Sequence, residues 1–308
     1  MDIVFLGTGG AWSVPEINCD CFICREMRSK GEKRERTSLL LSGETTLLID
    51  CGPDAGSQLR RHDVTRIDGV LISHEHGDHF IGLDELFAYK RNVPREDFIP
   101  IPVYMTQKSW EVIGPRFEYL VAMEVIEVRK VAPGTWFRQG EFRIFPFQTQ
   151  HGDFSKGAVG FVIKVRNPSG KEVRILYTSD FVDLPEVSPE LLEPDYLIMQ
   201  SFWLNEPREN RPHHMSFQRA IPYIEQLRPK KETFLVHIGD ADMVLGDPAN
   251  KNAKKCEPKD PLKPPSGGDP YPIPLNQEEW QKTIDHIMAD RNLPFNITVA
   301  YDDLKIRI

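Results

Sequence analysis

The sequence lacks both the long apolar runs of membrane proteins and the positive charge of nucleic-acid-binding proteins. No stretch of about 18 apolar residues occurs, so no segment is expected to span a bilayer. The formal net charge is -8 at pH 7, which gives no long-range attraction to nucleic acid or to a membrane surface. The opening residues, MDIVFLGTGG, also lack the basic start and apolar stretch of a secretory signal. We therefore expect a cytoplasmic protein that has neither a membrane nor a nucleic acid as its partner.

Cysteine is scarce, and its placement argues against a disulfide framework. The chain contains 5 cysteines, an odd number, and three of them are crowded together as Cys19, Cys21 and Cys24. A C-x-C-x2-C spacing brings three thiolates close together, which suits a tetrahedral zinc ion with one further ligand from elsewhere. Such thiolates persist in a reducing compartment. We expect Cys51, by contrast, to be a plain buried thiol.

Short β-rich runs separated by Gly and charged turns dominate the first half of the chain, and helical spacing occurs mainly later. The pattern predicts strands at 2–6, 37–41, 46–50, 70–73, 102–105, 142–148, 158–165, 173–178, 196–200, 234–237, 297–301 and 304–308. It predicts helices at 82–89, 215–227 and 277–291. No internal repeat is visible, so we expect a single domain over residues 1–308.

Residues 247–276 differ in amino-acid composition from the rest of the chain. They hold eight of the 25 prolines, with Lys and Gly interspersed and little apolar content. Such a segment is not expected to form a core of its own. We interpret it as an insertion in the domain, and its composition leaves open a role as a lid, as a dimer contact or as a disordered loop.

The strongest chemical signal is the motif H-E-H-G-D-H, residues 74–79, directly after an apolar strand. Because the backbone just past a strand is still extended, His74 and His76 project to the same side. Asp78 and His79 follow in the turn and can face a second ion. This mix of imidazole and carboxylate suits zinc, manganese or iron. Four such side chains in six residues predict a metal site rather than a solvated polar loop.

Three further candidate ligands close apolar strands elsewhere in the chain. His151 ends the run FPFQTQH, Asp180 ends ILYTSD and His237 ends FLVH. Taken singly, each is typical of a turn or a cap. Taken together, they supply the ligands that the first motif lacks. His151 can complete the first site, Asp180 can bridge both ions, and His237 can complete the second site.

This order of strand, H-x-H-x-D-H, and then His, Asp and His at strand ends resembles the metallo-β-lactamase superfamily. The resemblance covers nearly the whole chain and includes the stretches IVFLGTGG and LLIDCGPD, which match the superfamily's first strands and first loop. It implies an α+β fold, the αββα four-layer sandwich, with two β-sheets between helices and two divalent metal ions at one rim. It also implies that Asp50 holds a metal ligand in place.

A histidine pair points to one branch of that superfamily. His213 and His214 precede MSFQRAIPYI, so His214 is expected at or just before the start of a helix. An imidazole there can donate to a phosphoryl oxygen or protonate a leaving alkoxide, although a helix-capping role is the simpler alternative. The run HMSFQRA is similar to the HxTxxxA-like element of the phosphodiesterase branch, which includes ribonuclease Z and the phosphoribosyl cyclic phosphodiesterase of phosphonate breakdown. Only the His, the hydroxyl residue and the Ala carry over.

The cysteine motif is similar to an additional zinc site of the phosphonate-pathway enzyme. In that family the fourth ligand is a histidine three residues after the last active-site histidine, and here Asp240 stands at that place. Asp240 can bind zinc through its carboxylate, and Asp242 and Cys256 compete for the position. The resemblance therefore implies one structural zinc ion in addition to the two active-site ions.

These features together predict a metal-dependent hydrolase, and most specifically a phosphodiesterase acting on a small phosphodiester, cyclic or open. Asp78 is expected to orient a metal-activated hydroxide, and His214 to act on the departing oxygen. Three alternatives remain: a pyrroloquinoline-quinone-biosynthesis-like binding or oxidase protein, a ribonuclease Z-like hydrolase and a glyoxalase II-like hydrolase. The long basic, Gly-rich arm that would bind tRNA is missing from the sequence, which disfavours ribonuclease Z. Many proteins of this fold form homodimers, and the sequence leaves that question open.

Overall fold

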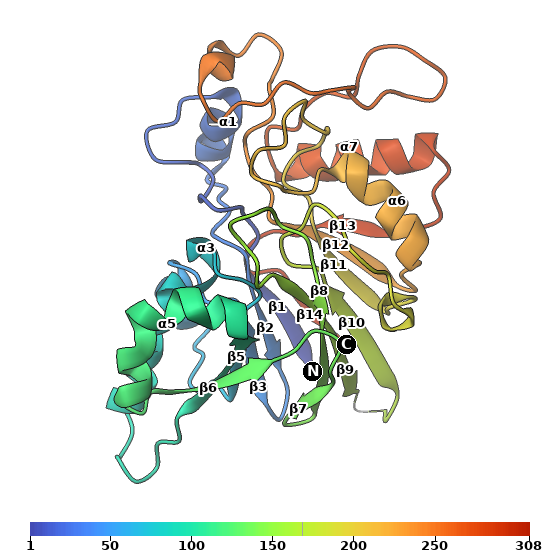
Figure 1. Ribbon diagram of the computed structural model, residues 1–308. Coiled ribbons are helices and arrows are strands. Elements are labelled where there is room, and N and C mark those ends of the chain that lie inside the picture. Colours follow the sequence, from blue (N-terminus) through green and yellow to red (C-terminus); the bar gives the residue numbers. More distant parts are fainter. Residues whose placement is uncertain (168) are drawn as a thin grey trace.

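The computed structural model describes residues 1–167 and 169–308, and these residues form two seven-stranded β-sheets with helices on their outer faces (Figure 1). The first sheet has the order β14-β1-β2-β3-β4-β5-β6 and the second β13-β12-β11-β10-β9-β8-β7. The first comprises β1 (Asp2–Gly7), β2 (Ser38–Ser42), β3 (Thr46–Ile49), β4 (Gly69–Leu71), β5 (Ile101–Thr106), β6 (Ile126–Val131) and β14 (Lys305–Arg307). The second comprises β7 (Phe137–Gln139), β8 (Phe142–Gln148), β9 (Val159–Arg166), β10 (Glu172–Tyr177), β11 (Tyr196–Gln200), β12 (Glu232–Val236) and β13 (Ile297–Val299).

The helices lie outside the two sheets, which confirms the predicted αββα arrangement. They are α1 (Phe22–Lys30), α2 (Ala55–Arg61), α3 (Gly77–Phe80), α4 (Phe87–Arg91), α5 (Gln107–Ala122), α6 (Phe217–Leu227) and α7 (Gln277–Asp290). Short 3-10 helices are η1 (Ile81–Leu86), η2 (Pro189–Leu191) and η3 (Pro248–Lys251). Apolar residues of α2 and α5 pack on the first sheet, and those of α6 and α7 pack on the second. No helix in the described residues combines the length and the apolar character that crossing a membrane requires.

Strand β1 shows why the apolar runs are nearly continuous. Ile3 and Phe5 point into the layer between the two sheets, whereas Val4 and Leu6 point outward into the layer beneath the helices. Because successive side chains of a strand face opposite sides, a strand covered on both faces must be apolar at every position. The chain therefore builds three apolar layers, one between the sheets and one under each set of helices.

Most of the predicted strands occupy their predicted places, and the differences lie chiefly among the helices. Residues 82–89 were predicted as one helix, but they form most of the 3-10 helix η1 and the start of α4. The pattern did not predict the following elements: α1, α2, α3, α5, β6, β7, η2 and η3.

The largest of these, α5, is hidden in the sequence by Gly114 and Pro115, which normally weaken or break a helix. Thr106 begins the helix because its hydroxyl accepts a hydrogen bond from the Ser109 amide over 3.1 Å. Buried side chains at helical spacing then fix the helix on the first sheet: Ile113, Phe117 and Leu120.

The proline-rich insertion is packed onto the rest of the chain. Leu262 and Tyr271 are buried in the same apolar cluster as α6 and α7, so the segment adds to a core although it cannot form one alone. Asp247 accepts a hydrogen bond from the Phe22 amide over 2.8 Å, which ties the start of the insertion to α1. In Figure 1 the segment runs in orange from beside α1 to α7.

The topology gathers strand ends at one rim. β3, β4 and β5 run parallel, as do β10, β11 and β12, so the carboxyl ends of each group meet at one edge. The last strand returns to the first: β14 pairs antiparallel with β1, with Val4 opposite Lys305. The Ile308 amide also donates to the Met1 carbonyl over 3.0 Å.

Replacing Phe161 with Ala is expected to lower the free energy of unfolding by about 3–5 kcal/mol, because it opens a cavity between the sheets. Phe161 is 0% exposed and Phe154 is 91% exposed, so the matched Phe154→Ala variant should change stability by no more than about 0.5 kcal/mol. Denaturant unfolding of both variants measures the difference. Equal losses would contradict the placement of the core between the two sheets.

Candidate metal centre

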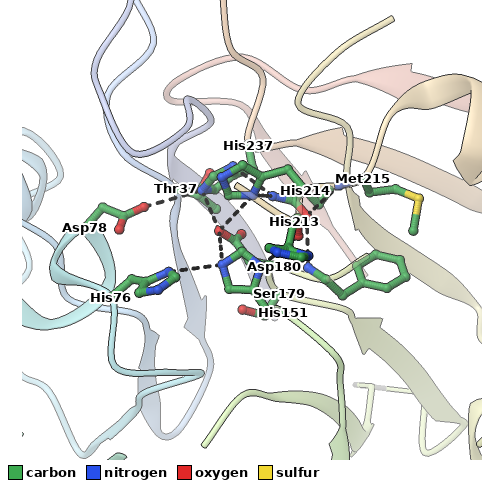
Figure 2. Close-up of polar contacts among 12 residues, drawn as sticks. Thr37, His76, Asp78, His151, Ser179, Asp180, His213, His214, Met215 and His237 are labelled. Carbon is green, nitrogen blue, oxygen red and sulfur yellow. Dashed lines mark hydrogen bonds and ion pairs between the residues drawn. The ribbon is translucent and has the colours of Figure 1, made fainter. Parts of the chain in front are cut away.

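All the predicted active-site residues lie on segments that follow strands at one end of the two sheets. The segment after β4 carries four of them, with His74 and His76 in the loop and Asp78 and His79 in the short helix α3. The loops after β8, β10 and β12 carry one each: His151, Asp180 and His237. Figure 2 shows Asp180 with His151, His214 and His237 around it and His76 nearby. The structure thus brings together residues that are up to 163 positions apart, from His74 to His237.

Two groups of ligand atoms lie side by side at this rim, and a third set, His151, Asp180 and His214, shares a residue with each of them. Each group's ligand atoms lie within 4.8 Å of one another, one group being His74, His76 and His151 and the other Asp78, His79, Asp180 and His237. The Asp180 Oδ2 atom is 3.0 Å from His237 Nε2 and 3.4 Å from His79 Nε2. It is also 3.7 Å from His151 Nε2, in the other group. Asp180 therefore stands between the two groups.

The donor set fits divalent cations. Among the described residues, five buried atoms of this rim have no hydrogen-bond partner: His74 Nε2, His79 Nε2, His237 Nε2 and both carboxylate oxygens of Asp180. Buried polar atoms in folded proteins nearly always find a partner, so such a convergence needs a compensating group. Imidazole nitrogens and carboxylate oxygens together are the ligands that zinc and manganese accept.

The surrounding charges hold Asp180 and His74 in metal-binding forms. Burial raises the pKa of Asp180, but His237 and His79 outweigh it and keep that pKa well below its ordinary value. Burial, together with His79 and His151, lowers the pKa of His74 well below its ordinary value. A carboxylate and a neutral imidazole are the forms that bind metal. Burial lowers the pKa of His79 and of His237, but the carboxylates of Asp78 and Asp180 outweigh it and raise the pKa of both, so these two rings must release a proton to bind metal.

Hydrogen bonds behind the ligands fix the orientation of two rings. Asp50 Oδ2 accepts from His79 Nδ1 over 2.8 Å and from the Tyr177 hydroxyl over 2.9 Å, while its Oδ1 accepts from the Ser73 amide. The carbonyl of His213 lies 2.9 Å from His151 Nδ1. With each Nδ1 engaged in this way, the Nε2 atoms of His79 and His151 face the rim. The expected supporting position of Asp50 is thus seen in the structure.

Strained backbone positions cluster where the chain turns from the sheets into the site. Asp50, Ser179, His213 and His237 all have left-handed backbones, with φ of 61°, 56°, 55° and 58°. Non-glycine residues adopt this region at a cost of about 1–3 kcal/mol each, and such residues concentrate at functional sites. Here the turn directs the side chains that end or follow a strand toward the rim.

His214 lies beside both groups and is not a helix cap. Ser216 begins α6, and its hydroxyl accepts from the Arg219 amide over 3.1 Å, so the capping alternative for His214 is wrong. The His214 ring stacks on Phe202 with 4.6 Å between centroids, and its Nδ1 lies 3.5 Å from Asp180 Oδ2. His214 is 5% exposed and lines a cavity of about 480 Å³ together with His76 and His151.

Gln200 positions His214, and sequence reasoning missed it. The Gln200 Oε1 atom accepts from the amides of Phe181 and Met215, at 3.0 and 3.2 Å. This orients the amide group so that Nε2 faces His214 Nδ1 at 2.6 Å, with His237 Nδ1 farther away at 3.1 Å. The available signal was a polar residue closing the apolar run YLIMQ.

The cysteine motif forms a separate buried cluster with Asp240. Asp240 Oδ2 lies 2.9 Å from Cys24 Sγ, 3.7 Å from Cys21 Sγ and 4.0 Å from Cys19 Sγ. The two competing candidates point elsewhere. Asp242 accepts from the Leu204 amide, and the Cys256 thiol faces the Lys254 carbonyl.

Two lysines of the insertion complete this cluster, and sequence reasoning did not point to them. Lys254 pairs with Asp240 Oδ2 and with Glu16, the latter over 3.1 Å. Lys255 is buried and donates to the carbonyls of Asp240 and Asp242, at 2.6 and 2.8 Å. The insertion thus brings positive charge to a cluster rich in thiols and carboxylate.

Known proteins share this sequence pattern over parts of their length. An octanoyltransferase of Porphyromonas gingivalis is 25% identical over 253 residues, 77% of this chain and 46% of that protein. A ribonuclease Z of Thermococcus kodakarensis is 24% identical over 183 residues, 56% of this chain and 49% of that protein. The chain therefore spans about half the length of these curated relatives.

Solved structures share the fold over the whole chain. A diphosphatase from the PhnP family superposes with a TM-score of 0.70 at 22% identity, covering 99% of this chain and 96% of the other. Zinc-bound PqqB from Methylobacterium extorquens superposes with a TM-score of 0.70 at 17% identity, covering 100% of both chains. At these identities the likeness concerns the fold.

A family model settles the superfamily that the sequence resembles. The model of the beta-lactamase superfamily domain matches residues 45–238, which include the H-E-H-G-D-H motif and every other predicted active-site residue. The superfamily consists generally of hydrolases, and its fold implies binding of divalent metal. Because the match covers more than half of the chain and the two-sheet architecture agrees with it, the chain belongs to the metallo-β-lactamase superfamily.

Proposed function

We propose that the protein is a metal-dependent phosphodiesterase that hydrolyses a small phosphodiester, cyclic or open. The observation that carries the proposal is the pair of adjoining ligand groups with Asp180 between them and His214 beside them on the cavity wall. The likeness to a ribonuclease Z and to a PhnP-family diphosphatase also favours chemistry at phosphorus.

Each group of side chains would hold one ion. The first ion would be held by His74, His76 and His151, the second by Asp78, His79 and His237, and Asp180 would contact both. Two divalent ions in such a site supply a water of lowered pKa and stabilise negative charge on the phosphoryl oxygens. Zinc and manganese both fit the ligand set.

Asp78 is proposed to orient the attacking water. It lines the cavity, and its Oδ2 lies 3.1 Å from His79 Nε2 and 3.5 Å from His237 Nε2. Burial raises its pKa, but His79 and His237 keep that pKa well below the ordinary value, so the group stays a carboxylate. A carboxylate can accept a hydrogen bond from the water and aim it at phosphorus.

His214 is placed to act on the departing oxygen. Burial lowers its pKa well below the ordinary value, so the ring is neutral near pH 7. Because the Gln200 amide faces Nδ1, the single ring proton of a neutral His214 belongs on Nε2. Through that N–H, His214 can donate a hydrogen bond to the departing oxygen and stabilise the negative charge that develops there.

Cys19, Cys21, Cys24 and Asp240 are proposed to hold a structural zinc ion. A zinc ion offsets only half of the negative charge of three thiolates and one carboxylate, and Lys254 and Lys255 offset the rest. The insertion would thus supply positive charge to the cysteine cluster as well as apolar side chains to the core. Since it also adds Leu262 and Tyr271 to the layer under α6 and α7, residues 1–308 are proposed to act as one domain.

The net negative charge of the chain and the modest volume of the cavity, about 480 Å³, favour a small molecule over tRNA as the substrate. A glyoxalase II-like thioesterase would have no evident use for His214 or for the cysteine cluster. A cytoplasmic location remains our expectation from the reduced cysteines, all five of which are free.

Metal analysis should find about three ions per chain, two at the rim and one at the cysteine cluster. Cys21→Ala should lose about one zinc ion, because three ligands hold it poorly, and Asp180→Ala should lose rim metal together with activity. Cys256→Ala is the matched control and should retain all of the metal, since its thiol points away from the cluster. A metal content near zero, or one unchanged by Cys21→Ala and Asp180→Ala, would contradict the assignment.

Replacing His214 with Ala should lower turnover of bis(p-nitrophenyl) phosphate by roughly 10²–10⁴-fold with manganese added, while metal content stays unchanged. A larger loss is expected for a phenyl ester than for a p-nitrophenyl ester, because the more basic phenolate oxygen gains more from the hydrogen bond that His214 donates. His286→Ala, on the exposed side of α7, is the control and should retain full turnover. Unchanged turnover in His214→Ala would remove that residue from the mechanism.

A further inference from the structure

The mouth of the cavity beside the metal centre is lined with exposed apolar side chains. Trp12 comes from the loop after β1, Phe154 from the loop after β8, and Ile81 from the start of η1. Trp12 is 64% exposed and Phe154 is 91% exposed, so neither side chain contributes much to the core. Large aromatic side chains left open beside a candidate catalytic site indicate that a ligand covers them.

Few charged groups accompany these aromatic side chains. Arg211 and Asp153 line the same cavity, and Arg211 is already hydrogen-bonded to Glu209 over 2.9 Å. A sugar alone would require many hydrogen-bond partners, and a second charged group would require a stronger counter-charge. The mouth instead offers broad apolar faces, which suit a flat, weakly polar group.

Two of the apolar residues at the mouth of the cavity are close along the chain to candidate metal ligands. Phe154 lies three residues after His151, in the same loop, and Ile81 begins η1 two residues after His79, so each is close along the chain to a candidate ligand. Glu75 holds the loop of Phe154, because its carboxylate accepts from the Gly157 amide over 3.0 Å and from the Ser109 hydroxyl over 2.9 Å. A group bound at the mouth would therefore lie a fixed, short distance from the metal centre.

We propose that Trp12 and Phe154 form a binding site for a planar aromatic group, and that the substrate is a nucleotide phosphodiester whose base stacks there. The inference rests on the proposed function, because it assigns the group attached to the phosphodiester that the metal centre would cleave. Stacking a base on an aromatic side chain contributes about 1–3 kcal/mol, which is about 5- to 150-fold in kcat/KM. The ribose and phosphate would then extend inward toward His76, Asp78 and His214.

The test compares two cyclic esters that differ by the base alone. Adenosine 2′,3′-cyclic phosphate carries the base, and 1,4-anhydroribitol 2,3-cyclic phosphate has the same rings without it. The manganese-loaded full chain should prefer the adenosine ester by about 5-fold or more. Trp12→Ala and Phe154→Ala should each remove most of that preference and leave the base-free ester within about 2-fold. Ile17→Ala, at an equally exposed apolar residue outside the cavity, should change neither.

A binding measurement makes the test independent of turnover. Adenosine 5′-monophosphate should quench the fluorescence of Trp12 in the wild-type protein, whereas ribose 5-phosphate should not. Trp12→Phe should lose this signal yet keep the preference for the adenosine ester, because a phenyl ring still stacks on a base.

Three outcomes would overturn the inference, and they differ from a failure of the proposed function. One is hydrolysis of bis(p-nitrophenyl) phosphate without any preference for the adenosine ester. Another is an equal loss for both cyclic esters in the two aromatic variants. The third is a change of oligomeric state in Trp12→Ala, seen by sedimentation, with the preference intact, which would make the mouth a contact between two copies of the chain. If the metal-loaded protein cleaves none of the three phosphodiesters, the proposed function itself fails.

Discussion

A single carboxylate oxygen, Asp180 Oδ2, attracts histidine rings from several segments of the rim and so holds these segments together electrostatically. It faces ring nitrogens from the loops after β4, β8 and β12, at distances from 3.0 to 4.0 Å. Buried charge of this kind persists only where groups of opposite sign meet it. The groups one step farther out keep the rings in place: Asp50 behind His79, the His213 carbonyl behind His151, and Gln200 behind His214.

The fold makes this convergence possible by dividing the ligands between its two sheets. The H-E-H-G-D-H motif follows β4 of the first sheet, while His151, Asp180 and His237 follow strands of the second. Strands covered on both faces leave little freedom to slide, since a shift by one residue would exchange their inward and outward side chains. The apolar layers thus set the relative position of two halves that each carry an incomplete site.

The features that could be predicted from the sequence were those visible within a short stretch of chain, namely the apolar strands and the polar residues that follow them. The candidate ligands at the rim were visible because they follow apolar strands closely, and the strands were visible because their runs are apolar and short. Partners that meet only through the fold were not visible, such as Gln200 beside His214 or Lys255 beside Asp240. Helix α5 was missed because Gly114 and Pro115 oppose it locally, whereas packing of Phe117 on the first sheet outweighs that local preference. The composition of the insertion predicted that it forms no core of its own. It did not reveal that buried residues of the insertion pack into the apolar cluster of α6 and α7.

The pairing of β14 with β1 has a consequence for the order in which the chain can fold. During synthesis the first strand leaves the ribosome long before its neighbour at the sheet edge, because residues 305–307 follow it by about 300 positions. Asp302, which accepts hydrogen bonds from the amides of Thr8 and Glu35, is equally late. The sheet that carries the H-E-H-G-D-H motif therefore keeps this edge open until residues 305–307 have left the ribosome. Such an edge can pair with other strands, so β1 is a segment for a chaperone to shield.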